Sequence, residues 1–584
     1  MKPCIRALWP LCFATLALAK PVKRDSPPNI DLDYGTFKGI ADPVSHSWGY
    51  LGMPYAEAGR FEHAQLFSRK LEGIQDATHF GPACTQKSTG SILAANGTGD
   101  LGIGAAVGFI EEALYPLSPQ SEDCLLINIQ VPENTRPDAK LPIIMWIHGG
   151  GFEIGAPYAA LGETLAAPGL AVNYRPAGLV QTAVETDQPI IVASISYRLN
   201  AFGFSASKEM EEAGLLNLGI EDQRVAMQWI KKHISKFGRD PDKLTIFGES
   251  AGSWSVSTHL LWDGGKQDLF RAAIAVSGGP VMVDGPERQQ ATFDRMVANC
   301  GCTDAADKIA CLKKADHADI SAAVNEEEYF LGASSLASTW TIRPDGKHLT
   351  DSPHRLAAQG KFAKVPLMIG DMRDEGTLFS LLTQLKVTTE KDFKDYFQSV
   401  WWPKASDEDM AGLMDLYPHD PTKGSPFGTG IFNNPTPNYK RVAALVGDFS
   451  FEAQRRNLLA HYPAPAWNYL TEVDVPSAGL LPNNPLTKLP ILGSFHAFDV
   501  FFYMFANLPR QLSKNVDNRQ ATAISFVRTL DPNNHGRDIP YWPQWTGKGR
   551  ETYHFLESGP GVIRDDYRVE QMEYINAHPD SFLI

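Results

Sequence analysis

One segment of the chain has residue types and spacing that suit nucleophilic chemistry. Residues 248–252 read Gly-Glu-Ser-Ala-Gly; the short apolar run 244–247 precedes them, and residues 254–261, which suit a helix, follow. A serine at a sharp strand-to-helix turn has strained backbone geometry, and glycines two residues away on either side let neighbouring chain pass close to it. We therefore predict that Ser250 is a nucleophile; the alternative is a surface Gly/Ser turn.

A glycine-rich segment offers what such a nucleophile needs. A serine hydroxyl attacks only after a base removes its proton, and the tetrahedral adduct needs hydrogen-bond donors for its oxyanion. Residues 148–152 read His-Gly-Gly-Gly-Phe and follow a predicted strand, so their backbone N–H groups can turn inward. We predict an oxyanion hole from the N–H groups of Gly150, Gly151 and Ala251. The alternative is a flexible loop.

The elements that must position these residues alternate between strand and helix. Residues 143–147 and 189–195 are near-continuous apolar runs, as expected for strands buried on both faces of a mostly parallel sheet. Between residues 222 and 237, apolar side chains recur at helical spacing, which predicts a helix that covers the sheet. Residues 240–242 (Asp-Pro-Asp) predict a turn before the strand at 244–247. This order of elements indicates a doubly wound α/β fold.

Composition and charge exclude several classes of protein. The 584 residues are 43% hydrophobic and 21% charged, which is typical of a globular chain and excludes collagen, a coiled coil and a wholly disordered chain. At roughly 150 residues per domain the length suggests about four domains, although large α/β chains exceed that size as single units. The net charge is −14 and no dense run of Lys and Arg occurs, so we expect no nucleic-acid partner.

The N-terminal segment has the pattern of a secretory signal peptide. Lys2 and Arg6 precede an apolar run over 7–19 that ends in Ala-Leu-Ala, a small-x-small cleavage pattern. We predict a signal peptide at 1–19. Lys23 and Arg24 form a dibasic pair, which predicts a short propeptide at 20–24. Loss of residues 1–24 would change the net charge from −14 to −19. The apolar run is too short to span about 30 Å of hydrocarbon, so we expect a secreted protein without stable membrane insertion.

The cysteine count agrees with an oxidising compartment. Of seven cysteines, Cys4 and Cys12 lie in the predicted signal peptide, and the remaining five predict two disulfides and one free thiol. No Cys-x-x-Cys pair occurs, so we expect no metal site. The one N-glycosylation sequon, at Asn96, lies in a polar, glycine-rich stretch.

Several motifs in a fixed order resemble one protein family. They are residues 121–128 (Ser-Glu-Asp-Cys-Leu-Leu-Ile-Asn), 148–152, 196–204 (Ser-Tyr-Arg-Leu-Asn-Ala-Phe-Gly-Phe), the run from 217–224 (Asn-Leu-Gly-Ile-Glu-Asp-Gln-Arg) to 252, and the tail motifs 542–545 and 565–568. The chain resembles the type-B carboxylesterase/lipase family, densely over about 34–279 and thinly beyond about 376. The resemblance implies an α/β-hydrolase fold, in which helices flank a central, mostly parallel sheet and large insertions form a lid. It also implies a single domain over 25–584.

The resemblance further implies the base and the acid of a catalytic triad. The base maps to His496 and the orienting acid to Glu375, in the chain order serine, acid, histidine that the fold requires. An imidazole near neutral pKa accepts the serine proton and returns it to the leaving alkoxide, while the carboxylate fixes the tautomer. Asp374 is the main alternative to Glu375, whereas Asp187 or Asp222 would break the order.

Cysteine pairs can be carried over in the same way. The resemblance implies one disulfide between Cys84 and Cys124 and a second between Cys300 and Cys311. Cys302 then remains as the free thiol, although Cys300 and Cys302 are equally compatible with that short loop.

Three charged residues also match family positions. Arg60 and Glu122 resemble a salt-bridge pair of the family. Glu249, beside the predicted nucleophile, resembles a pocket carboxylate, and a purely structural role is the alternative.

The segment between Cys84 and Cys124 bears on the substrate. Apolar residues recur in it at helical spacing: Ile103, Val107, Ile110 and Leu114. In fungal lipases and sterol esterases of the resembled family, the equivalent loop is a mobile flap over an apolar acyl tunnel. The alternative is a helix that packs permanently in the core.

The residues and the resemblance together predict a secreted serine hydrolase that cleaves carboxylic esters through an acyl-enzyme, without metal or cofactor. We expect a lipase-like or carboxylesterase-like enzyme for apolar acyl esters, which are small-molecule or lipid substrates, and transient contact with a lipid interface. One alternative is an esterase for a secondary metabolite or a plant-wall ester. The other is a non-catalytic, cholinesterase-like binding protein, which the retained Ser250, Glu375 and His496 disfavour.

Overall fold

A sheet of eleven strands forms the centre of the computed structural model, which describes residues 26–42, 45–88, 119–133, 135, 139–157, 177–473, 490–500 and 514–584. In spatial order the strands are β18 (Gly561–Arg564), β17 (Glu551–Leu556), β16 (Ala466–Glu472), β15 (Leu367–Met372), β14 (Ala272–Val276), β13 (Arg239–Glu249), β11 (Leu141–Ile147), β12 (Ile191–Ile195), β10 (Leu126–Pro132), β4 (Ser47–Pro54) and β3 (Ile40–Asp42). Every pairing from β12 across to β17 is parallel, and antiparallel pairs lie at both edges. The predicted α/β class is confirmed.

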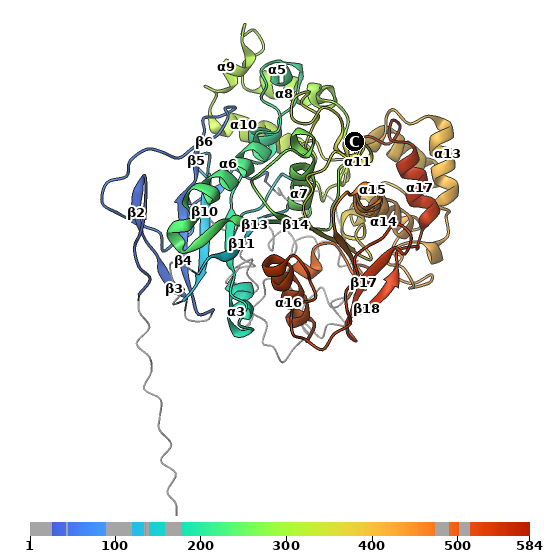
Figure 1. Ribbon diagram of the computed structural model, residues 1–584. Coiled ribbons are helices and arrows are strands. Elements are labelled where there is room, and N and C mark those ends of the chain that lie inside the picture. Colours follow the sequence, from blue (N-terminus) through green and yellow to red (C-terminus); the bar gives the residue numbers. More distant parts are fainter. Residues whose placement is uncertain are drawn as a thin grey trace, which may run out of the picture.

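Strand β11 shows how the sheet separates two cores. Ile143, Met145 and Ile147 belong to one cluster of buried residues, whereas Ile144 and Trp146 belong to the other. Side chains alternate between faces along a strand, so an unbroken apolar run is needed where both faces are covered. The covering helices are α6 (Leu218–His233) and α7 (Ala251–Leu261) on the first face and α3 (Ala177–Glu185) and α16 (Lys514–Thr529) on the second (Figure 1).

The predicted elements near the serine are present, with one difference. The helix expected over 222–237 is α6 followed by the 3₁₀-helix η1 (Ile234–Phe237). The turn expected at 240–242 lies inside β13, where the register with β11 jumps. Leu141 pairs with Arg239 but Ile143 pairs with Leu244. The intervening residues of β13 therefore form a bulge, and the chain does not reverse its direction there.

A helical layer follows β15 along the chain. Helix α14 (Tyr439–Gly447), the π-helix η8 (Asp448–Glu452) and α15 (Ala453–His461) are continuous, and α13 (Asp407–Leu416) and α17 (Val569–Ala577) lie on the same side of the molecule (Figure 1). At the opposite side is a small sheet of β1 (Ile30–Leu32), β2 (Gly35–Lys38) and β7 (Ile74–Asp76). Further α-helices are α4 (Asn200–Phe204), α5 (Lys208–Glu212), α8 (Gln290–Asn299), α9 (Lys308–Leu312), α10 (His317–Glu326), α11 (Pro353–Ala358) and α12 (Glu390–Tyr396).

Four sequence predictions lie outside the described residues: the signal peptide at 1–19, the propeptide at 20–24, the sequon at Asn96 and the helical pattern at 103–114. Among the helices that are described, none combines the length and the apolar character needed to cross a bilayer.

Candidate active site

Ser250 lies at a tight turn between β13 and α7. Its backbone has φ +57° and ψ −125°, in the positive-φ region that side chains rarely adopt. A Cβ atom at position 248 would lie 2.2 Å from the carbonyl oxygen of Gly252, and one at position 252 would lie 2.1 Å from that of Ile147. Glycine is therefore required on both sides of the serine, and the strained turn expected from the sequence is present.

The glycine-rich segment lies directly against this turn. A Cβ atom at position 149 would lie 2.8 Å from Cβ of Ser250. Gly150 and Gly151 both have positive φ, at +101° and +63°. Tyr197 stacks on the His148 ring, with centroids 4.4 Å apart, and its hydroxyl donates a 2.7 Å hydrogen bond to the carbonyl of His148. These contacts make the segment a packed loop beside the serine.

His496 and Glu375 meet although 121 residues separate them. His496 Nδ1 lies 2.5 Å from Glu375 Oε2, and both side chains are buried. The backbone N–H of Met372 donates a 2.6 Å hydrogen bond to Glu375 Oε1, which fixes the carboxyl group at the end of β15. The imidazole packs against the rings of Phe379 and Phe451, at centroid distances of 4.9 and 4.6 Å, and these two rings also stack on each other. The contact at Nδ1 and the aromatic packing thus hold the ring in one orientation.

The other ring nitrogen of His496 faces the serine turn. Its Nε2 lies 3.1 Å from Oε1 of Glu249, the residue that precedes Ser250. Burial, opposed by His496 and reinforced by the carboxyls of Asp499 and Glu375, raises the pKa of Glu249 to about 8. Burial lowers the pKa of His496, against the pull of Glu249. Both side chains therefore favour their neutral forms near neutral pH, which leaves the imidazole able to accept a proton.

The alternative acids have other partners. Asp374 Oδ1 accepts hydrogen bonds from Ser425 Oγ and the Phe427 N–H, both 2.8 Å, and its Oδ2 accepts one of 3.0 Å from the Ser494 N–H. Asp222 forms a buried ion pair with Arg198 at 2.7 Å. The structure thus brings Glu375 to His496, and it uses Asp374 to join two loops.

A model of the carboxylesterase family matches residues 26–575. The chain belongs to this family. It is 36% identical to Lipase 5 of Diutina rugosa, over 92% of this chain and 93% of that protein, and 37% identical to Secreted lipase 1 of Botryotinia fuckeliana, over 79% and 78%. The structure of Aspergillus niger EstA superposes with a TM-score of 0.77 at 25% identity and covers 96% of this chain and 99% of that one.

Membership of the carboxylesterase family confirms two predictions. The fold is that of the α/β hydrolases, as the superposition on EstA shows. The protein is a serine hydrolase of the carboxylesterase/lipase class, whose reaction is the hydrolysis of carboxylic esters. In the described part of this carboxylesterase, no three His, Cys, Asp or Glu side chains are grouped so that they could hold a metal ion.

The disulfides of this carboxylesterase include one correction. Cys84 is bonded to Cys124, as the resemblance implied. The predicted pair of Cys300 with Cys311 is wrong: Cys311 is bonded to Cys302, the alternative, and Cys300 has a free thiol. The physical reason is position, because Cys300 caps the end of α8, whereas Cys302 lies two residues further on and is fully buried, with its Cα 5.8 Å from that of Cys311.

The salt bridge implied by the resemblance connects the first disulfide loop to the residues that follow the second. Arg60 binds Glu122 through two contacts, Nη2 to Oε1 at 2.5 Å and Nε to Oε2 at 2.9 Å. Its Nη1 also donates to the carbonyls of Leu312 and Ala315, at 3.0 and 2.5 Å. Glu122 is engaged in this contact and takes a structural role.

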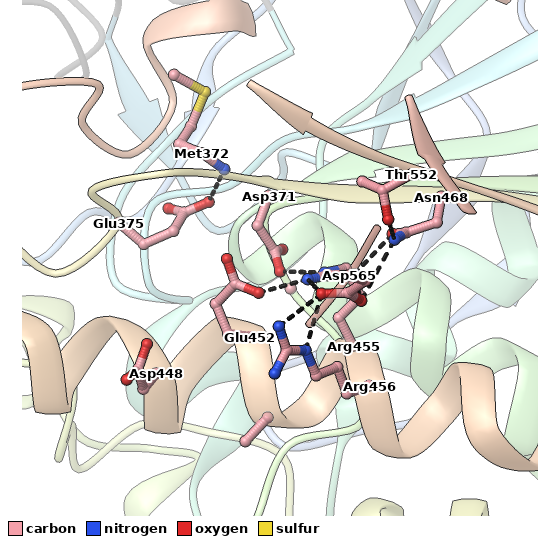
Figure 2. A network of polar contacts seen from close by, with 12 residues as sticks. Asp371, Met372, Glu375, Asp448, Glu452, Arg455, Arg456, Asn468, Thr552 and Asp565 are labelled. Atoms are coloured by element: carbon pink, nitrogen blue, oxygen red, sulfur yellow. Dashed lines mark hydrogen bonds and ion pairs between the residues drawn. The ribbon is translucent and has the colours of Figure 1, made fainter. Parts of the chain in front are cut away.

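Sequence reasoning missed a buried cluster of charges next to the site, shown in Figure 2. Arg455 is completely buried and contacts Asp371 Oδ2 and Asp565 Oδ2, both at 2.7 Å, as well as Glu452. Arg456 adds a contact of 2.6 Å to Asp565 Oδ1. The sequence contains one signal for this cluster. Asp565 belongs to the tail motif at 565–568, which resembles the family although it lies far from the serine in sequence.

Proposed function

We propose that the protein is a secreted esterase that cleaves esters with apolar acyl chains through an acyl-enzyme on Ser250. The observation that carries the proposal is the placement of His496. One ring nitrogen binds Glu375 at 2.5 Å, and the other faces the turn that holds the serine. That arrangement is what a general base with an orienting acid requires.

The proton follows a short path in the proposed reaction. Ser250 Oγ attacks the ester carbonyl carbon while His496 Nε2 accepts the hydroxyl proton, and Glu375 stabilises the imidazolium that forms. The same proton then passes to the leaving alkoxide, which breaks the ester bond and leaves the acyl group on Ser250. Water repeats the sequence, gives its proton to His496 and releases the acid, after which the serine regains a proton.

The N–H groups of Gly150, Gly151 and Ala251 are proposed to stabilise the oxyanion. Ala251 is the first residue of α7, where N–H groups have no partner within the helix and the helix dipole favours negative charge. Gly149 approaches Ser250 closely, so the glycine-rich segment lies where the oxyanion forms. A neutral Glu249 adds no negative charge to this site near neutral pH, which suits the developing oxyanion.

Aromatic side chains and the relatives support an apolar acyl group. Phe330 lies against Gly151, where a Cβ atom would come within 2.9 Å of the phenyl ring. Phe379 and Phe451 pack against His496. The relatives named above are lipases, one of them called a secreted lipase, so we propose a lipid ester as substrate and secretion after removal of residues 1–19.

The test is the hydrolysis of p-nitrophenyl esters of increasing acyl length, with and without detergent. We expect Ser250→Ala to abolish turnover while the protein stays folded. Ser253→Ala is the matched control, because that buried hydroxyl of α7 donates to the carbonyl of Gly278 and should affect only stability. Undiminished turnover by Ser250→Ala would refute the proposal. A short-chain optimum would keep the mechanism and exclude the long-chain substrate.

A further inference from the structure

A loop before α14 exposes two large apolar side chains next to each other. Ile431 and Phe432 are 68% and 75% exposed. Among the large apolar residues that are exposed in the described part of the chain, these two alone are neighbours in sequence. The segment 424–438 around them contains no Asp, Glu, Lys, Arg or His. Water therefore surrounds an uncharged apolar tip, which we name after its residues Ile431 and Phe432.

A buried lysine holds the tip in place. Lys440 in α14 is almost fully buried, and its Nζ donates to Thr429 Oγ1 at 2.6 Å, to the Gly430 carbonyl at 2.8 Å and to the Phe432 carbonyl at 3.3 Å. Burying an ammonium group is costly unless its hydrogen bonds are satisfied, and here three of them go to one turn of the loop. The exposure of Ile431 and Phe432 is thus built into a fixed loop conformation.

The other end of the loop is fixed to the catalytic segments. Asp374 accepts hydrogen bonds from Ser425 and Phe427 in the loop and from the Ser494 N–H. Asp374 precedes Glu375, and Ser494 is two residues before His496. One carboxylate therefore links the base of the apolar tip to both the proposed acid and the proposed base.

A third apolar side chain belongs to the adjoining segment. Thr436 Oγ1 donates a 3.1 Å hydrogen bond to Gln384 Oε1, which brings the end of the loop to the 3₁₀-helix η5 (Thr383–Leu385). Leu385, the next residue, is 42% exposed.

We propose that Ile431, Phe432 and Leu385 insert into the surface of a lipid aggregate and hold it beside the active site. The proposal rests on the proposed function, because it assigns a surface to the lipid substrate. Burial of apolar side chains supplies the attraction, and the absence of charge on the loop avoids the cost of moving ions out of water. With a net charge of −14, the protein should bind zwitterionic lipid by this route and gain nothing from anionic lipid.

The experiment measures partitioning of the full-length protein onto pure phosphatidylcholine vesicles by co-sedimentation. We expect Ile431→Ser with Phe432→Ser to lower the partition coefficient by about tenfold or more, because full burial of either side chain is worth that factor. Turnover of a water-soluble short-chain p-nitrophenyl ester should not change. The matched control compares Ile74→Ser with Ile431→Ser. Ile74 is 62% exposed on β7, which pairs with β2, and β2 lies at the opposite side of the molecule from α14 (Figure 1).

The outcomes separate the two proposals. Normal partitioning of the double variant, or an equal loss in Ile74→Ser, would overturn the role of the tip even if Ser250→Ala confirms the chemistry. If the proposed function is wrong, Ser250→Ala will still hydrolyse esters, and binding to vesicles can be measured all the same. As a second test, Phe432→Trp should retain binding, and high salt should not weaken it. Loss of binding in either condition would contradict an apolar anchor.

Discussion

Two clusters of buried charge lie at neighbouring positions of this molecule, and they differ in how charge is compensated. The arginine cluster comprises Arg455, Arg456, Asp371, Glu452 and Asp565 and contains two guanidinium groups among its carboxylates. The proposed catalytic cluster, which comprises Glu249, Glu375 and His496, contains carboxylates and one imidazole. In Figure 2, Asp371 lies between Glu375 and the arginine side chains.

Burial has opposite results for two carboxyl groups, Asp565 of the arginine cluster and Glu249. Burial alone would raise the pKa of Asp565, but Arg455 and Arg456 outweigh it and lower that pKa to about 2. Glu249 has no guanidinium partner, so burial raises its pKa to about 8. Asp565 therefore stays ionised between the two arginines and joins α15 to the tail. In the proposed catalytic cluster, Glu249 stays close to a change of protonation near neutral pH.

The largest expected effect compares two adjacent acids, Glu375 and Asp374. Glu375→Gln keeps the shape of the side chain but replaces the carboxyl group that lies 2.5 Å from His496 Nδ1 with an amide, so the imidazole loses the partner that fixes its tautomer. We expect kcat to fall by roughly 10⁴-fold with little change in melting temperature. Asp374→Asn is the matched control and should lower the melting temperature with little change in kcat. Steady-state kinetics and thermal unfolding measure both. A larger loss of kcat in Asp374→Asn would make Asp374 the acid.

Replacement of Arg455 tests the structural role of the arginine cluster. Arg455→Met leaves the carboxylates of Asp371 and Glu452 without their buried partner, so we expect a loss of roughly 3–5 kcal/mol in the free energy of unfolding in urea. Arg564→Met is the control, because its contact with Asp566 is exposed and should be worth less than about 1 kcal/mol. Normal stability with a collapse of turnover in Arg455→Met would show that the two clusters are not separate in function.

The smallest effect is an opposite pH dependence of stability in the two clusters. Asp565 has a lowered pKa, so its stabilising contribution is complete above its ordinary pKa of 3.8 and is lost as the pH falls toward about 2. Glu249 has a raised pKa, so stability is greatest below its ordinary value of 4.5 and falls as the pH rises toward about 8.

Urea unfolding at a series of pH values measures this difference. The wild type should exceed Asp565→Asn by about 2 kcal/mol near neutral pH, and the difference should shrink on acidification. Glu249→Gln should gain on the wild type as the pH rises from about 5 to about 8. Differences of the same sign in the two variants would contradict the contrast between the clusters.

The strained serine turn could be predicted from the sequence because its causes are local. Glycine is required at 248 because the Gly252 carbonyl, four residues away, leaves no room for a Cβ atom. It is required at 252 because the Ile147 carbonyl, on the adjacent strand, does the same. Strands β11 and β12 could also be predicted, because both of their faces are covered and their sequences are therefore unbroken apolar runs. The bulge in β13 was read as a turn, because a Pro between two Asp looks the same in either setting.

Long-range contacts set the limit of prediction. His496 and Glu375 have no shared periodicity, and the resemblance to a family was needed to pair them. Arg455 was missed because its partners come from β15, from η8 and from the tail, where each is an ordinary polar residue. Cys300 and Cys302 could not be separated, because side-chain direction at the end of α8 decides which one reaches Cys311.

The central claim is that Ser250 is the activated nucleophile of this carboxylesterase. Labelling of the folded protein with a fluorophosphonate, followed by peptide mass spectrometry, tests it most directly. The account predicts one covalent adduct, on Ser250, that is absent from Ser250→Ala and forms much more slowly in His496→Gln. An adduct on another serine, or no adduct in protein that still hydrolyses esters, would contradict it.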